Sequence, residues 1–315
     1  TTGSSNVAIG NNSLHCFQTG SFNTAVGKSS LLGAGSECGD GAGSTYSTGS
    51  YNTALGAESL NNVTSGSGSV GIGYQALYTA TAEGNLTAIG YQAAYANTSG
   101  TGTVALGYQA LTSNTTGDYN TSVGNQSLAS NTTGGYNTAT GSNSLGSNTT
   151  GQQNTATGYR ALYSNTTGNY NTGLGYQSLY SNTTGIQNTA AGWGSLDSNT
   201  TGDYNTALGT ASLHDNTTGS YNTSSGMESL TNNTTGSYNT AFGDGALYTN
   251  TTGGTNTAIG RAAGASNSTG SGNVFIGYNA GYNETGSNKL YIDNSSTSSP
   301  LIYGDFANNT VTVNG

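Results

Sequence analysis

The sequence predicts an all-β chain, a parallel β-solenoid or β-roll of about sixteen 17-residue coils. Three observations support this prediction: a short phrase that recurs at a constant step, an abundance of strand and turn residues, and a shortage of apolar and charged residues. Internal repetition at a fixed period indicates an architecture in which each unit packs only on its neighbours. A coil of this length is too short for a helical hairpin repeat of about 34 residues or a propeller blade of about 40.

The phrase Asn-Thr-Ala-apolar-Gly sets the period. Its apolar position recurs at a constant 17-residue step from Leu55 to Ile276, and the same step separates Ile9 from Val26. The step from Val26 to Leu55 is longer than one period by twelve positions. In a solenoid each residue stacks on its equivalent about 4.8 Å away, so extra residues have to leave the stack as a loop. We expect this loop within residues 33–48, which are rich in Gly, Ser and Thr.

Each repeat contains three recognisable pieces. Tyr-Asn-Thr-Ala-Leu-Gly is typical of a strand closed by glycine, Ser/Ala-Leu predicts a second and shorter strand, and Asn-Thr-Thr-Gly predicts a turn. The residue before the variable apolar position is nearly always small, as at Ala54 and Ala105. Successive strand residues face opposite sides, so one side must meet something very close. This demand is met by a thin coil interior or by contact with another chain.

The repeat stops near residue 287. Three strand candidates follow, at 290–292, 301–303 and 310–313. Solenoid ends expose unpaired strand edges, so we expect these strands to cover the end. The predicted organisation is a repeat domain at 1–287 and a β neck or cap at 288–315, although residues 310–313 could instead pair with a further molecule.

Composition excludes several classes of function. Apolar residues make up 32% and charged residues 5%, too little for a rounded core. A net charge of −9 with only 4 Lys and Arg argues against nucleic-acid binding. No apolar run approaches the ~18 residues of a membrane-spanning helix, so we expect no membrane insertion. The chain starts at Thr1 without Met, as expected of a processed chain or a fragment.

The repeats resemble those of a known family. Asn-Val-Ala-Ile-Gly at 6–10 and Asn-Thr-Ala-Leu-Gly at 205–209, each followed by Ser/Ala-Leu, resemble the head repeats of trimeric autotransporter adhesins. This resemblance covers roughly residues 1–285 and implies a left-handed parallel β-roll with three chains around one axis. The 17-residue period is longer than that of the family's usual head repeat. The stretches 272–281, 288–294 and 300–306 look like phage tail fibres and bacterial surface fibres.

Several residues are candidates for special roles. Cys16 and Cys38 could form a disulfide if the chain is extracellular, whereas two thiols alone cannot make a zinc site. A second set of candidates is a surface or interface column of aromatic residues, Tyr74, Tyr91, Tyr108, Tyr159, Tyr176 and Tyr278. This column could contact sugars or a partner, or it could equally cover the solenoid sides or fill a trimer interface. The Asn-Thr-Thr triplets are formal glycan acceptors, or else turns that recur because coils must superimpose. Their asparagines are Asn114, Asn131, Asn148, Asn165, Asn182, Asn199, Asn216, Asn233 and Asn250.

The sequence indicates a non-enzymatic function. His15 and His214 are about twelve coils apart, and no carboxylate pair suits catalysis, so we expect no catalytic residues, metal or cofactor. The leading hypothesis is a homotrimeric structural or adhesive fibre segment of a phage tail or cell surface, outside the cell, bound to a surface glycan or protein receptor. One alternative is an extracellular filament that polymerises end to end. A third hypothesis is ice binding through regular Thr arrays.

Overall fold

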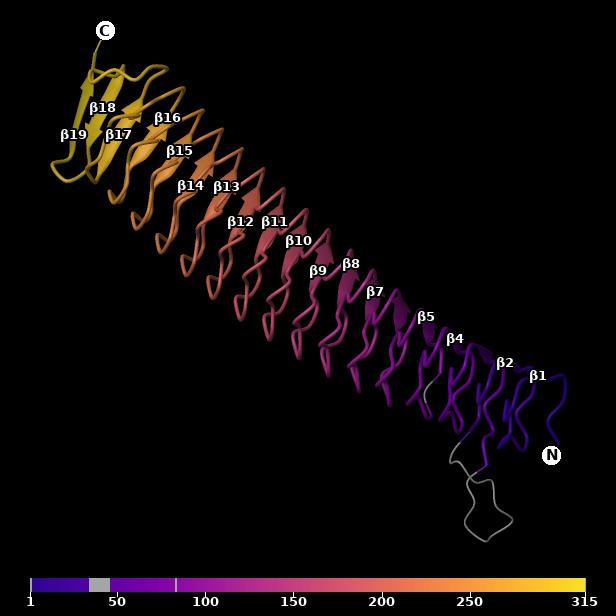
Figure 1. The fold of residues 1–315 in the computed structure, drawn as a ribbon. Coiled ribbons are helices and arrows are strands. Elements are labelled where there is room, and N and C mark those ends of the chain that lie inside the picture. The colour runs from indigo at the N-terminus through magenta and orange to yellow at the C-terminus, as the bar shows by residue number, and fades with distance from the viewer. Residues whose placement is uncertain (1, 34–45, 83, 315) are drawn as a thin grey trace. The chain divides into compact units, whose positions relative to one another are not determined.

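The structure, a computed structural model, describes residues 2–33, 46–82 and 84–314. The chain forms two compact units, residues 1–157 and residues 158–315. Each unit is a parallel β-solenoid in which every coil contributes one short strand (Figure 1). Within the described residues, no helix has the length and apolar character needed to cross a bilayer.

The coil strands are short and recur at the predicted phrase. In the first unit they are β1 (Val7–Ile9), β2 (Thr24–Val26), β3 (Thr53–Leu55), β4 (Val70–Ile72), β5 (Thr87–Ile89), β6 (Val104–Leu106), β7 (Thr121–Val123), β8 (Thr138–Thr140) and β9 (Thr155–Thr157). In the second unit they are β10 (Thr172–Leu174), β11 (Thr189–Ala191), β12 (Thr206–Leu208), β13 (Thr223–Ser225), β14 (Thr240–Phe242), β15 (Thr257–Ile259) and β16 (Val274–Ile276).

Strand register follows the sequence period. Within each unit a strand pairs in parallel with the next, and residue i lies opposite residue i+17, as in Thr206 with Thr223. The step from β2 to β3 is the exception, because Val26 lies opposite Leu55 across the insertion. The predicted loop at 33–48 lies mostly outside the described residues. At its edges the stack is intact: Gly33 donates to the carbonyl of Asn61 (2.9 Å), and Ser47 bridges Phe17.

The prediction of a second strand at Ser/Ala-Leu is wrong, because the leucine backbone adopts a turn conformation. Leu77 has φ of 56° and Leu213 has φ of 51°, both in the left-handed region that β-branched and bulky residues rarely enter. Each leucine side chain is nevertheless fully buried. Left-handed turns point the leucine into the coil, where Leu60 and Leu162 lie against the central strand positions Gly71 and Gly173.

The coil interior combines this thin apolar layer with stacked amides. The asparagine before each strand, such as Asn222, accepts a hydrogen bond at Oδ1 from the backbone N–H of its equivalent one coil on, Asn239 (2.9 Å). Its Nδ2 donates to the carbonyl of Gly236 (2.8 Å). A second column of asparagines lies at the Asn-Thr-Thr-Gly turns. Repeated side-chain hydrogen bonds therefore satisfy polar groups that a larger apolar core would have to exclude.

Glycine ends each coil strand because neighbouring coils approach too closely for a side chain. Gly73 has φ of 124°, and a Cβ added there would collide with the carbonyl group of Gly90. Only glycine combines this backbone conformation with so close a contact. The same requirement recurs one coil later at Gly90, against Gly107.

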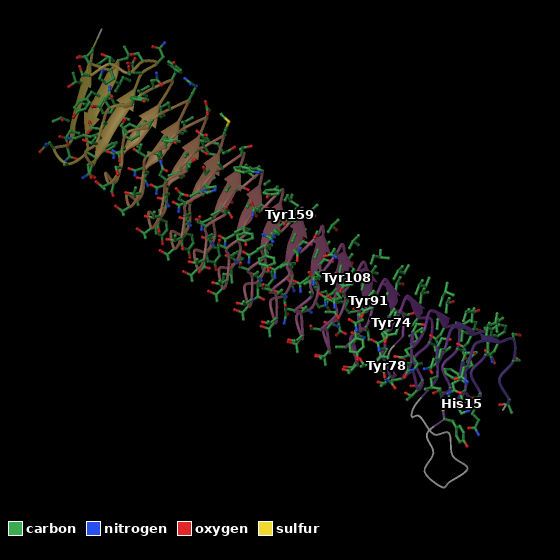
Figure 2. The ribbon with its side chains drawn as sticks, viewed as in Figure 1. His15, Tyr74, Tyr78, Tyr91, Tyr108 and Tyr159 are labelled. Carbon is green, nitrogen blue, oxygen red and sulfur yellow. The ribbon has the colours of Figure 1, made fainter. Side chains whose placement is uncertain are left out.

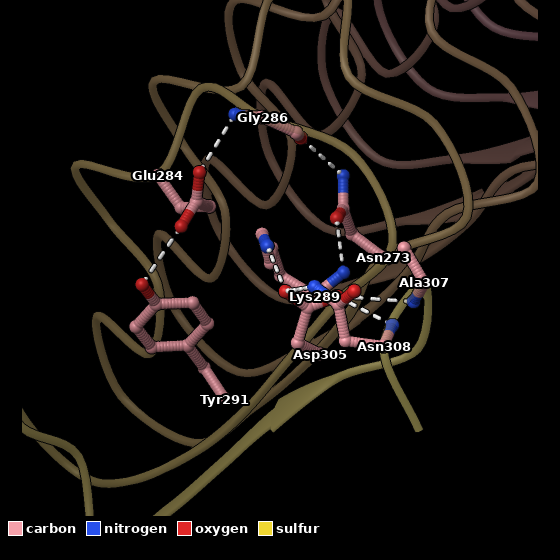
Figure 3. Close-up of polar contacts among 8 residues, drawn as sticks. All are labelled: Asn273, Glu284, Gly286, Lys289, Tyr291, Asp305, Ala307 and Asn308. Carbon is pink, nitrogen blue, oxygen red and sulfur yellow. Dashed lines mark hydrogen bonds and ion pairs between the residues drawn. The ribbon is translucent and has the colours of Figure 1, made fainter. Parts of the chain in front are cut away.

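The C-terminal residues of the second unit form the predicted cap. Strand β17 (Lys289–Ile292) pairs in parallel with β16, and Val274 lies opposite Leu290, one position short of the 17-residue register. Strands β18 (Ile302–Asp305) and β19 (Thr310–Val313) then add in antiparallel orientation. Within the cap, Lys289 Nζ lies 2.9 Å from Asp305 Oδ2 (Figure 3).

Candidate binding surface

The residue that follows the strand-closing glycine lies on the side of its coil and forms a column. In the first unit the predicted Tyr74, Tyr91 and Tyr108 lie on successive coils and remain 42–47% exposed (Figure 2). Their ring centroids are 5.5 Å and 5.3 Å apart, so the three rings form one stack. Desolvation, followed by the charge of Glu58, raises the pKa of the Tyr74 hydroxyl.

The second unit brings only part of the predicted column together. Tyr159 and Tyr176 stack at 5.3 Å, and Trp193 extends the stack at 6.4 Å. The next position in the column is Thr210, so the stack ends at the indole. Tyr278 lies farther along the same column, where the Arg261 guanidinium is 5.8 Å from its ring centroid.

Beside these tyrosines runs a column of glutamine side chains. Gln92 Nε2 donates to Gln75 Oε1 (2.9 Å), and Gln109 Nε2 donates to Gln92 Oε1 (3.1 Å). Each amide is thereby held by its equivalent one coil away. Sequence reasoning missed this ladder, although the same 17-residue spacing would have revealed it.

A second aromatic column lies four residues after the first, and we call it the outer tyrosine column. Tyr78 and Tyr95 stack at 5.2 Å, and Tyr163 and Tyr180 stack at 5.5 Å. The two columns are neighbours, since the Arg160 guanidinium lies 5.2 Å from the Tyr159 ring centroid and 5.5 Å from that of Tyr163.

Stacking determines what these columns offer to a ligand. A sugar stacks on the face of an aromatic ring, but inside a stack both faces are covered by neighbouring rings. A continuous stack therefore presents ring edges and hydroxyl groups to solvent. Ring faces are open to a ligand only at the ends of a stack, where the next residue of the column is not aromatic.

The nine asparagines proposed as glycan acceptors all lie in the interior, fully buried. Asn216 Nδ2 donates to Asn199 Oδ1 (2.8 Å) and to the carbonyl of Gly219 (2.9 Å), and Asn216 Oδ1 accepts from Asn233 Nδ2 (2.7 Å). A glycan on Nδ2 would replace one of the two hydrogens that these bonds use, and it could not fit between coils. The alternative that the triplets recur as superimposed turns accounts for this placement.

The two cysteines are placed unequally. Cys16 is buried, at 1% exposure, whereas Cys38 lies outside the described residues. Their disulfide therefore stays a prediction.

One histidine has carboxylates on both sides. His214 Nδ1 lies 2.7 Å from Asp215 Oδ1, and Nε2 lies 3.5 Å from Asp197 Oδ2. Burial raises the pKa of Asp197. The nearby His214 partly offsets this increase, and the charge of Asp215 adds to it. Sequence reasoning treated these carboxylates as dispersed because it did not align Asp197 with His214 one coil on. In the described part of the chain, no group of three or more His, Cys, Asp or Glu residues is arranged to hold a metal ion.

The cap contains a hollow of about 330 Å³ lined by Glu284, Tyr291 and residues 296–298, among others. Glu284 is occupied within it, since it accepts hydrogen bonds from the Tyr291 hydroxyl and the Gly286 N–H, both at 2.7 Å (Figure 3). Burial, followed by the bond to Glu284, raises the pKa of Tyr291. These bonds attach the cap to the last coil, and they leave Glu284 committed to structure.

Comparison of the chain with protein-family models, curated proteins and solved structures found no match in any of the three. The similarity to autotransporter heads and tail fibres therefore rests on the repeat motifs alone. The strand pairing independently establishes a parallel β-solenoid built from repeats.

Proposed function

We propose that this chain is a non-enzymatic structural and adhesive fibre segment, carried outside the cell on a phage tail or a cell surface, and that it assembles as a homotrimer. The third residue of each coil strand carries the proposal, because this position points outward. Many of the large apolar residues there are 37–60% exposed: Ile9, Leu55, Ile89, Leu174, Leu208, Phe242, Ile259 and Ile276.

This outward position forms an apolar stripe along the strands of each unit. In a chain whose apolar content is only 32%, a repeated exposed aliphatic position indicates a surface that is covered in the assembly. A second copy of the chain presents the same stripe at the same coil spacing, so identical chains match one another along their length. The resemblance to trimeric heads supports three copies and a left-handed coil.

The oligomeric mass tests the homotrimer. Sedimentation equilibrium of the intact chain should give three times the chain mass of 31.4 kDa. Replacing Leu174, Leu208 and Phe242 together by Thr should yield folded monomers, because Thr already occupies this position at Thr140 and the coil accepts it. A wild-type monomer, or a variant that stays trimeric, would contradict the proposal.

A second candidate function is an end-to-end filament. Among the described residues β19 pairs with β18 alone, and its Val311 and Val313 side chains are 67% and 69% exposed. Such a strand edge can template a further strand. Negative-stain images that show long filaments, lost on removal of residues 310–315, would favour this candidate over the fibre segment.

Ice binding draws its support from the first strand position. In the second unit this position is Thr in every strand from β10 to β15, one coil apart. Thermal hysteresis in solutions of the intact chain would support the hypothesis, and its absence would remove it.

A further inference from the structure

The outer tyrosine column is interrupted near the end of the second unit. Tyr248 and Tyr282 occupy this column two coils apart, and Ala265 occupies the coil between them. Where tyrosines follow one another in this column their rings stack at 5.2–5.5 Å. Ala265 therefore separates two tyrosines by one missing ring.

The size of the gap suits one ring. Two coil rises of about 4.8 Å place Tyr248 and Tyr282 roughly 10 Å apart. Aromatic groups stack at centroid separations of about 4.5–7 Å, so a ring placed midway would contact both tyrosines. The two tyrosines are 38% and 39% exposed, and Ala265 between them is 7% exposed.

The gap belongs to a hollow of about 300 Å³, the lower limit for a small-molecule site. Its lining includes the small residues Gly245, Ala262 and Ala265, whose equivalents in the first unit include Gln75, Gln92 and Tyr78. Ser266 and Asn279 add polar groups to its lining. A slot that combines two aromatic rings with several polar groups is typical of a sugar site, since a pyranose has both an apolar face and a ring of hydroxyls.

The charge of the hollow selects among sugars. Arg261 is the only charged residue in its lining and is one of 4 basic residues other than histidine in the chain. Arg261 Nε pairs with Asp244 Oδ2 (3.1 Å), which fixes the guanidinium, and its side chain is 60% exposed. The Arg261 Nη1 atom lies 3.5 Å from the Tyr278 hydroxyl. The Arg261 N–H groups that Asp244 and Tyr278 leave unused point to a ligand that carries a carboxylate, which a guanidinium can bind through two parallel hydrogen bonds.

We propose that the slot between Tyr248 and Tyr282 binds one pyranose ring that carries a carboxylate, as in a hexuronate unit of an acidic polysaccharide. The tyrosines stack on the two faces of the ring, and Arg261 pairs with the carboxylate. This assignment rests on the proposed adhesive function, for which it names a class of ligand. It does not depend on the proposed homotrimer.

The test uses the full chain and a matched pair of probes. Titration calorimetry should detect an oligogalacturonate with a dissociation constant of about 1 mM or tighter, as expected for a single stacked ring with one ion pair. The fully methyl-esterified oligomer should bind at least tenfold more weakly, because its carboxylates are neutral. Equal binding of the two probes, or no binding of the acid, would overturn the proposal.

Two variants separate the slot from other surfaces. Ala265→Tyr should complete the aromatic stack and abolish binding while leaving the circular dichroism spectrum unchanged. The control is Ala129→Tyr, which places the same ring in the same column between Thr112 and Gly146 and should bind the acid normally. Arg261→Gln should weaken the affinity for the acid about tenfold and leave the affinity for the ester unchanged.

The variants also distinguish this proposal from the fibre assembly. Persistent binding by Ala265→Tyr would show that the sugar lies elsewhere. Sedimentation equilibrium on the same samples reports the oligomeric state independently, so loss of the trimer and loss of the sugar site give different results.

Discussion

At the residue scale, side-chain amides replace much of the apolar core. The asparagines of the Asn-Thr-Thr-Gly turns form a ladder along the coils. Each one donates a hydrogen bond to the glycine carbonyl of its own turn and another to the equivalent asparagine of the neighbouring coil. Removing one amide takes a hydrogen bond from several buried groups at once and leaves at least one of them without a partner, which costs about 1–3 kcal/mol. These asparagines should therefore be more sensitive to substitution than their polarity suggests.

Asn216→Ala should destabilise the second unit by about 3 kcal/mol, because Asn199 Oδ1, the Gly219 carbonyl and Asn233 Nδ2 all lose a hydrogen bond. Urea unfolding monitored by circular dichroism measures the change. Thr218→Ala in the same turn is the control, since this side chain is exposed, and should change stability by less than about 0.5 kcal/mol. Equal effects would show that the ladder contributes little.

The Lys289–Asp305 pair should make the cap sensitive to pH. The hydrogen bond from Lys289, followed by one from Asn308, lowers the pKa of Asp305 from 3.8 to about 2. A lowered pKa favours the folded carboxylate, so its stabilisation is complete above about pH 4 and is lost as the pH falls through 2. Asp305→Asn should speed hydrogen exchange in β17–β19 at pH 6.

The difference between Asp305→Asn and the wild-type chain should shrink as the pH falls through 2 and disappear well below it, where the native carboxyl group is protonated as well. Exchange in β10–β12 of the same unit serves as the internal control, since these strands are distant in sequence from the pair. A difference that persisted well below pH 2 would show that the effect comes from the shape of the side chain rather than from its charge.

At the element scale, a larger side chain at the centre of a strand is matched by smaller residues at the turns that face it. Most coils place Ala in the strand and Leu in the turn, but β16 carries Phe275 while the turns beside it carry Gly264 and Gly281. A Cβ added to either glycine would collide with the Phe275 ring. One aromatic ring thus fills the space of the missing leucines.

Phe275→Ala should destabilise the second unit by about 3–5 kcal/mol, since it leaves a cavity between the two glycine turns. Gly264→Leu alone should also destabilise, by collision with the ring. The combination of Phe275→Ala with Gly264→Leu and Gly281→Leu restores the usual pairing and should recover most of the stability. Thermal unfolding measures the coupling, and purely additive losses would contradict this exchange.

The sequence predicted the strands because an alternation of Thr, Ala and a larger residue at a fixed period can be read directly. It did not predict the conformation of Ser/Ala-Leu, since nothing in a leucine signals a positive φ. With this backbone the leucine lies against the centre of the next strand, as Leu60 does against Gly71. The aromatic column was predicted from its spacing, whereas its interruption at Ala265 became meaningful only once neighbouring tyrosines were seen to stack.

At the scale of the whole molecule, the constant 17-residue step makes coils interchangeable. The backbone and side-chain ladders of the regular coils recur at this step, so a complete coil can be removed without changing the contacts of its neighbours. An incomplete coil displaces every following residue from its partner.

Deleting residues 216–232 removes one complete coil and rejoins Asp215 to Asn233, which recreates an Asp-Asn-Thr-Thr-Gly turn. We expect this variant to fold with nearly unchanged circular dichroism and a slightly lower melting temperature. Deleting residues 216–231, one residue fewer, should unfold the second unit because the ladders lose register. Comparable stability of the two deletions would show that the step is not enforced.

The left-handed turns also have a consequence for the order in which the coils form during folding. Each coil holds non-glycine residues such as Leu77, Gln75 and Asn85 at positive φ, at a cost of roughly 1–2 kcal/mol each. The hydrogen bonds of the asparagine side chains offset this cost, and they connect one coil to the next. A single coil on its own therefore bears the backbone strain without these hydrogen bonds. Formation should therefore resemble crystal growth: a slow nucleus of several coils, followed by rapid addition of single coils to a growing face.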